Sequence, residues 1–437
     1  MAVPATGLVR SIGRWTLVGL VLNGVLGSGI FGLPSTLIGK LGPASLWAWP
    51  IGAGLVGIIM LCFAEVASRF RDAGGPYLYA RVAFGDFAGI QMGWVAYLVR
   101  LTSAASNVNL FVLYLAEFWP GVRHPAAGAV VLISLLAFFA VINYRGADLG
   151  ARLSNVVVAA KLVPVTLFAL VGLALVVARG EAAVQPVVTP TPAAWLDGIV
   201  LLVFAYGGFE AGLMPLAEAK QPERDAPFAL LMTLAVCTVL YILVELVVLR
   251  ALPNAPSSSR PLAAAAAALI GPMGARFMAV AALLSVLGWL AAAMVNVPRL
   301  TYAMAANGDL PSIVGRVHPT YRTPHVSIVL FAVLVAALAL SGSFLQNVTL
   351  AVVSRLVNYG VVCAALPALR RQERTAPDRV PPARFRLKAG PLLAALGVAI
   401  TALLITRITT REALIMAAVV AGASVNYFAS RSRPLKP

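Results

Sequence analysis

The chain has 437 residues, of which 60% are hydrophobic and 11% are charged. Soluble domains carry about 25% charged residues, so this composition excludes an ordinary water-soluble fold, and the same apolar content excludes a disordered chain. The formal net charge of +17 comes from basic residues between apolar runs rather than from one basic patch, which indicates membrane topology and no nucleic-acid partner.

Twelve apolar runs follow one another along the chain, each near the roughly 20 residues that a helix needs to cross a bilayer. We therefore predict an all-α integral membrane protein with about 12 transmembrane helices in a lipid bilayer. The first run follows Arg10 and Arg14 and is too long for a signal peptide, so we expect an uncleaved span. An alanine run at 263–268 predicts a short helix before the eighth span. The expected spans are 15–38, 43–67, 86–118, 125–143, 153–178, 195–218, 227–250, 275–303, 325–342, 346–369, 390–407 and 412–429.

Lysines and arginines are unevenly distributed between the alternate connections of these spans. With the amino terminus inside, most of those outside the spans fall on one side, including seven in the segment 370–388. Cytoplasmic loops are enriched in basic residues. We expect both termini and the segment 370–388 to be cytoplasmic.

Cysteine and histidine give no sign of a disulfide or metal framework. Cys62, Cys237 and Cys363 lie inside apolar runs and have no paired spacing, and the three histidines fall near predicted loops. We expect no metal site and no cofactor.

Two spans are interrupted by glycine at corresponding places. The first contains the glycine-rich segment 23–34, and the sixth contains the pair Gly207 and Gly208, with Gly207 following Gly27 by 180 residues. Each glycine in a helix interior costs roughly 1 kcal/mol relative to alanine. Gly-interrupted spans at matching positions in two halves point to a transporter's binding site, so we predict that helices one and six are broken.

The broken ends predict the chemistry of the ligand. Free amides at 27–29 would suit a carboxylate, and free carbonyls at 204–207 would accept hydrogen bonds from an ammonium group. These two poles fit a free α-amino acid better than a sugar or an inorganic ion.

Five motifs, in order over about 300 residues, resemble the amino acid–polyamine–organocation superfamily and specifically its bacterial amino acid permeases. The two broken segments resemble the unwound motifs of that family. The other matching segments are 73–79, 218–227 and the pair 298–311 with 317–324.

The resemblance implies a 5+5 inverted-repeat fold, alternating access and a bacterial inner-membrane location. The first repeat would comprise residues 1–193 and the second 194–370. Residues 371–437 would form the cytoplasmic loop and two peripheral spans.

The resemblance also implies where a substrate binds. The carboxylate would bind the backbone at 26–29 together with Ser28, and the amine would bind carbonyls at the two breaks. Phe204 falls where such permeases have an aromatic gate, although packing alone would also explain it. The expected substrate-binding residues are Val25, Leu26, Gly27, Ser28, Gly29, Phe204, Ala205 and Gly207.

Four ionisable or aromatic residues within the spans are candidates for coupling or gating. Lys161 resembles a built-in replacement for the cation that bridges spans one and five in sodium-coupled relatives of this fold. Glu210 could relay protons or anchor the break in span six. Arg100 could pair with Glu210, neutralise an acidic substrate side chain or reach the interface. Trp289 is the nearest candidate for an aromatic residue over the site. Arg355, a further charged residue within a span, is given no coupling role and requires a partner inside the bundle.

The sequence therefore predicts a permease that moves amino acids by alternating access, through proton coupling, facilitated diffusion or exchange. Lys161 disfavours sodium coupling. A polyamine or organic-cation carrier and a non-transporting amino acid sensor share these motifs. An enzyme is disfavoured because the interior of the spans contains no histidine, no paired aspartates and no acidic cluster with metal spacing.

Overall fold

The computed structural model describes residues 13–70, 75–146, 149–180, 185, 187–213, 219–377 and 380–431. These residues form helices joined by short connections. Several predicted features lie outside the described residues: both chain ends, the end of span six at 214–218, and residues 73 and 74 of the motif 73–79.

The predicted first span is divided into three helices. They are α1 (Arg14–Val25), α2 (Gly29–Gly32) and α3 (Pro34–Leu41). The backbone at Leu26 is extended, with φ −72° and ψ 93°, which ends α1. Pro34 begins α3 at a position where its missing N–H is tolerated.

The predicted sixth span is divided in the same way. It comprises α9 (Pro192–Ala205) and α10 (Phe209–Gly212). The hydroxyl of Thr191 caps the start of α9 by accepting a hydrogen bond from the amide of Ala194. Gly208 has φ +101°, a conformation that favours glycine, and it separates the two helices.

The remaining predicted spans correspond to one helix each. Nine segments of the described chain are long and apolar enough to cross a membrane, and α14 and α16 are shorter apolar helices. The short helix predicted at the alanine run is α12. The other elements are η1 (Gly42–Ala44), α4 (Ser45–Ala67), α5 (Gly75–Phe84), α6 (Asp86–Leu115), η2 (Pro120–Arg123), α7 (Pro125–Tyr144), α8 (Leu149–Arg179), α11 (Pro222–Ala251), η4 (Ala255–Ser257), α12 (Pro261–Ile270), α13 (Pro272–Ala306), α14 (His325–Ser341), α15 (Phe344–Thr375), α16 (Gly390–Ile405) and α17 (Thr410–Arg431).

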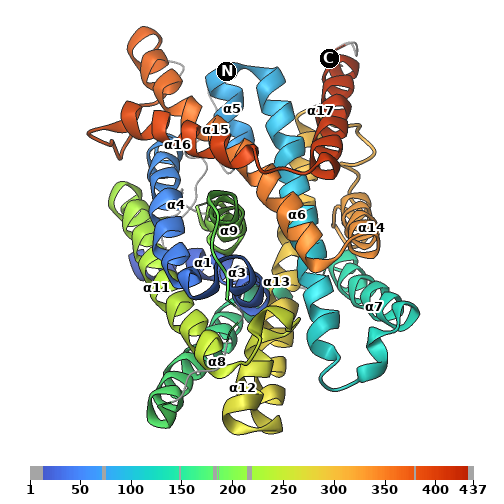
Figure 1. Cartoon of the computed structure of the whole chain (residues 1–437). Coiled ribbons are helices and arrows are strands. Elements are labelled where there is room, and N and C mark those ends of the chain that lie inside the picture. The colour runs from blue at the N-terminus through green and yellow to red at the C-terminus, as the bar shows by residue number, and fades with distance from the viewer. Residues whose placement is uncertain are drawn as a thin grey trace.

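The two broken spans lie at the centre of the bundle. In Figure 1, α9 is seen near the middle, with α4 and α11 to one side of it and α6 and α13 to the other. α1 packs against α11 and α10, while α9 packs against α4, α15 and α3. α7, α14 and α17 lie at one edge of the molecule (Figure 1). The described chain is therefore an all-helical bundle with helices long and apolar enough to span a membrane, and its breaks lie inside the core.

Candidate functional site

The broken spans cross each other backbone against backbone. A Cβ atom added to Gly24 would lie 2.6 Å from the carbonyl oxygen of Gly208, and one added to Gly212 would lie 2.7 Å from the Cα of Val21. Real Cβ atoms do not approach other heavy atoms so closely. Glycine is thus required here because α1 and α10 leave no room for a side chain between them.

We expect alanine at Gly208 to be among the most destabilising single-methyl changes in the chain. The backbone angle of Gly208 strains any residue with a Cβ atom, at a cost of about 1–2 kcal/mol in the free energy of unfolding. The added methyl group would also clash with the backbone of Gly24. The matched control is Gly271→Ala, because Gly271 has φ +77° but open space around it. Size-exclusion chromatography of heated, detergent-solubilised protein would compare them; equal loss in both variants would contradict the tight crossing.

The first break presents unpaired polar groups. Among the described residues, the backbone amides of Gly27, Ser28 and Gly29 have no backbone acceptor. The hydroxyl oxygen of Ser28 is buried and has no hydrogen-bond partner. Because buried polar groups are normally hydrogen-bonded, this break can accept an anionic group such as a carboxylate.

The second break already holds side-chain donors on the carbonyls predicted to bind an amine. The Phe204 carbonyl accepts a hydrogen bond of 3.2 Å from Nη1 of Arg355, and the Ala205 carbonyl accepts one of 3.0 Å from the hydroxyl of Tyr241. Sequence reasoning missed both donors. The only signal was that a charged residue within a span must have a partner in the bundle.

Lys161 joins α8 to the first break. Its Nζ donates to Oδ1 of Asn23 over 3.2 Å and to the Leu26 carbonyl over 3.3 Å, and its side chain is buried. A small cavity lies beside it, lined by Leu26, Gly27, Ile30, Phe31, Lys161, Val165, Leu240 and Ser285. Lys161 thus satisfies a carbonyl that the end of α1 leaves free.

Glu210 is tied to the second break. Its Oε2 accepts hydrogen bonds from the amide of Gly208 at 2.9 Å and from the hydroxyl of Tyr359 at 3.2 Å. Oε1 lies 3.7 Å from Nε of Arg355, and the charge of Arg100 also acts on this carboxylate. This geometry supports the anchoring alternative and pairs Glu210 with Arg355 rather than with Arg100 alone.

Trp289 is not brought to the breaks by any described contact. It is half-buried on α13, and the residue of that helix that lines the cavity is Ser285, about one turn earlier. The role predicted for Trp289 as an aromatic cover stays a prediction.

Ion pairs close the bundle at both ends. At one end, Asp197 of α9 binds Lys40 of α3 at 3.3 Å and Arg407 at 2.8 Å. At the other end, Glu65 of α4 accepts two hydrogen bonds of 2.7 Å from Arg370 of α15. The first set of pairs joins α9 to α3 and to the residues after α16. The second joins α4 to α15 at the opposite end of the bundle.

A second network lies on the same side as Glu65, on the short helix α5. Asp309 accepts hydrogen bonds from the Tyr77 hydroxyl and, at 2.7 Å, from Arg81. Burial and this bond to Asp309 raise the pKa of Tyr77 to about 12. The network ties α5 to the segment that follows α13.

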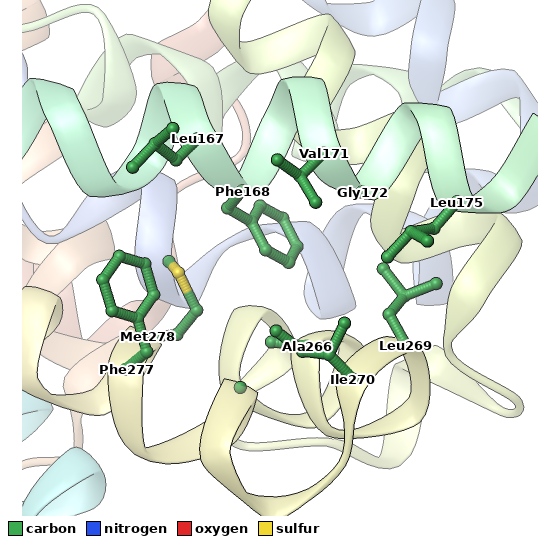
Figure 2. A pocket seen from close by; sticks show the side chains of 11 residues that line it. Leu167, Phe168, Val171, Gly172, Leu175, Ala266, Leu269, Ile270, Phe277 and Met278 are labelled. Carbon is green, nitrogen blue, oxygen red and sulfur yellow. The ribbon is translucent and has the colours of Figure 1, made fainter.

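A further pocket is apolar and lies between α8, α12 and α13. Figure 2 shows its hydrophobic side chains facing one another across the gap between these helices. A zwitterion would find no charged or hydroxyl group there. The lining residues are Leu167, Phe168, Val171, Gly172, Leu175, Ala266, Leu269, Ile270, Gly274, Phe277 and Met278.

Comparison with known proteins gives the relatives of this chain in sequence. Residues 12–429 match the amino acid permease family. The chain is 28% identical to the methylthioribose transporter of Bacillus subtilis, over 82% of this chain and 79% of the relative. It is 27% identical to the serine/threonine exchanger SteT of the same organism, over 74% of each chain. It is also 27% identical to the cadaverine/lysine antiporter of Escherichia coli, over 75% of this chain and 74% of that protein.

Proposed function

Because this chain belongs to the amino acid permease family, we propose that it carries free amino acids across the membrane by alternating access, through exchange or uniport. The observation that supports this most directly is the pair of broken helices crossing at Gly24 and Gly208. The first break has amides without a backbone acceptor, and the second has carbonyls that accept side-chain hydrogen bonds. Broken helices that face each other at mid-membrane are how transporters of this kind bind a substrate.

The substrate carboxylate would bind the amides at 27–29 and the hydroxyl of Ser28. The amine would bind carbonyls of Val25, Phe204 and Gly207. Since Arg355 occupies the Phe204 carbonyl, amine binding there requires the guanidinium to move. Phe204 lies under that guanidinium, with its ring centroid 5.2 Å from Cζ of Arg355, so the gating role of Phe204 would be coupled to the same movement.

The decisive experiment is transport by the purified protein alone. The protein would be reconstituted into liposomes loaded with one unlabelled amino acid at a time, and uptake of labelled amino acids would be measured. Accumulation driven by the internal amino acid supports a carrier. Binding of an amino acid without any uptake would instead indicate a sensor.

Transport is expected to be independent of sodium. Lys161 places an amine donor between α8 and the end of α1, on the Leu26 carbonyl, where a sodium ion would otherwise bind the carbonyls freed by the break. Replacing external sodium with potassium should leave the initial rate of uptake unchanged, whereas a rate that rises with sodium concentration would contradict this role. A pH gradient imposed in the same vesicles would reveal proton coupling.

The membrane would be the bacterial inner membrane, with both termini in the cytoplasm. The distribution of basic residues between alternate connections supports this orientation. Reporter fusions at residue 437 that are active only in the cytoplasm would test it.

A further inference from the structure

Positive charge exceeds negative charge around the two breaks. Among the described residues, the side chains of Lys161 and Arg355 donate hydrogen bonds to backbone carbonyls at the breaks. The carboxylate described there is that of Glu210, and the positive charge of Arg100 also acts on it. Lys161, Arg355 and Glu210 are all buried. A bound cation would add to this excess, and a bound anion would reduce it.

Other buried carboxylates of the described helices do not offset this charge. Asp225 pairs with Arg14 at the start of α11, and Glu412 accepts a hydrogen bond from the Thr409 amide at the start of α17. Glu65 is bound by Arg370 at the end of the bundle, and Glu245 on α11 faces Ser45 and Trp49 of α4. None of these carboxylates makes a described contact with the side chains at the breaks. The imbalance therefore belongs to the site itself.

Arg355 is held at the second break by incomplete interactions. Nη1 donates to the Phe204 carbonyl at 3.2 Å and Nη2 to the Ser103 hydroxyl at 3.3 Å, but Nε is buried without a hydrogen-bond partner. The nearest carboxylate oxygen, on Glu210, lies 3.7 Å from Nε, beyond hydrogen-bond distance. A guanidinium group remains charged in proteins and has five donors, so this one retains unused capacity for an anion.

An arriving amine and Arg355 compete for the same carbonyl. If the amine takes the Phe204 carbonyl, the guanidinium loses a hydrogen bond in an environment with little water, and it then requires another acceptor. A second carboxylate on the substrate would supply one, in the planar two-point geometry that arginine favours. A neutral side chain supplies none, and a cationic side chain adds repulsion.

We propose that the site prefers amino acids with an anionic side chain, and that Arg355 is the residue that determines this specificity. The charge of Arg100 also acts on the Glu210 carboxylate. This inference rests on the proposed transport function and narrows its substrate class. It separates this chain from the cadaverine/lysine antiporter that it resembles in sequence.

The first test is a substrate series with wild-type protein in liposomes. Labelled glutamate and aspartate should be taken up at least about tenfold faster, at equal low concentration, than serine, leucine, lysine or cadaverine, the factor that one charge-assisted hydrogen bond provides. Uptake of neutral or basic compounds equal to or above that of glutamate would overturn the inference and leave the proposed transport function standing. No uptake of any compound would instead remove the proposed function.

The second test isolates Arg355. Arg355→Gln should lower the ratio of glutamate uptake to serine uptake by about tenfold. Arg355→Lys keeps the charge but loses the planar pair of donors, so its ratio should lie between those of the wild type and Arg355→Gln. Arg276→Gln, at an exposed position on α13, is the control and should keep the wild-type ratio. An unchanged glutamate-to-serine ratio in Arg355→Gln would overturn the assignment, and if that variant does not fold, the wild-type series decides alone.

Discussion

Replacing Lys161 with methionine is expected to lower amino acid uptake by at least about tenfold while the protein remains folded. Methionine keeps the length and apolar stem of the side chain but cannot donate to the Leu26 carbonyl or to Asn23. A buried acceptor left without a donor costs about 1–3 kcal/mol, and 1.4 kcal/mol corresponds to a factor of ten. Initial uptake rates in liposomes between pH 6 and 8 would measure the effect.

Lys220→Met is the matched control for this experiment, because Lys220 is exposed and lies outside the spans. It should transport at the wild-type rate. If Lys161→Met also transported at that rate with the same pH response, Lys161 would have no part in the transport cycle.

Replacing Glu210 with alanine should destabilise the protein by about 3–5 kcal/mol, as observed when one partner of a buried ion pair is removed. The change leaves Arg355 without its nearest carboxylate and removes the acceptor for the Gly208 amide. The temperature at which the monodisperse peak disappears in size-exclusion chromatography would fall by several degrees.

Two further variants make this result specific. Asp197→Asn weakens an ion pair that is only partly buried, with side chains about one-third exposed, and should cost no more than about 1 kcal/mol. In the double variant Glu210→Gln with Arg355→Gln, the loss should be smaller than the sum of the two single losses. If Glu210→Ala were as stable as Asp197→Asn, the buried pair of Glu210 and Arg355 would not contribute more to stability than the partly exposed pair.

The position of the two breaks could be predicted from the sequence because glycine acts locally. The concentration of glycine at 23–34 and the pair at 207 and 208 lowers helix propensity wherever the chain folds. The structure divides both spans at these places. The spans themselves could be predicted for another local reason: in such a chain, the bilayer admits only long apolar helices.

The contacts of the charged residues could not be predicted in the same way. Arg355 reaches the Phe204 carbonyl across 151 positions of sequence, and nothing near Arg355 in the chain indicates which break it faces. The two alternatives for Glu210 likewise depended on which groups the fold brings to it. For Trp289, the sequence does not fix the register of α13 to within one helical turn, and the residue of that helix that lines the cavity is Ser285. The role of Trp289 therefore stays a prediction.

The crossing of Gly24 and Gly208 has a mechanical consequence. With backbone resting directly on backbone, there is no flexible side chain at that point to absorb relative displacement between α1 and α10. A tilt of α1 therefore displaces α10, and the reverse, about the contact between the two glycines. Opening a path to one face of the membrane then moves both helices together.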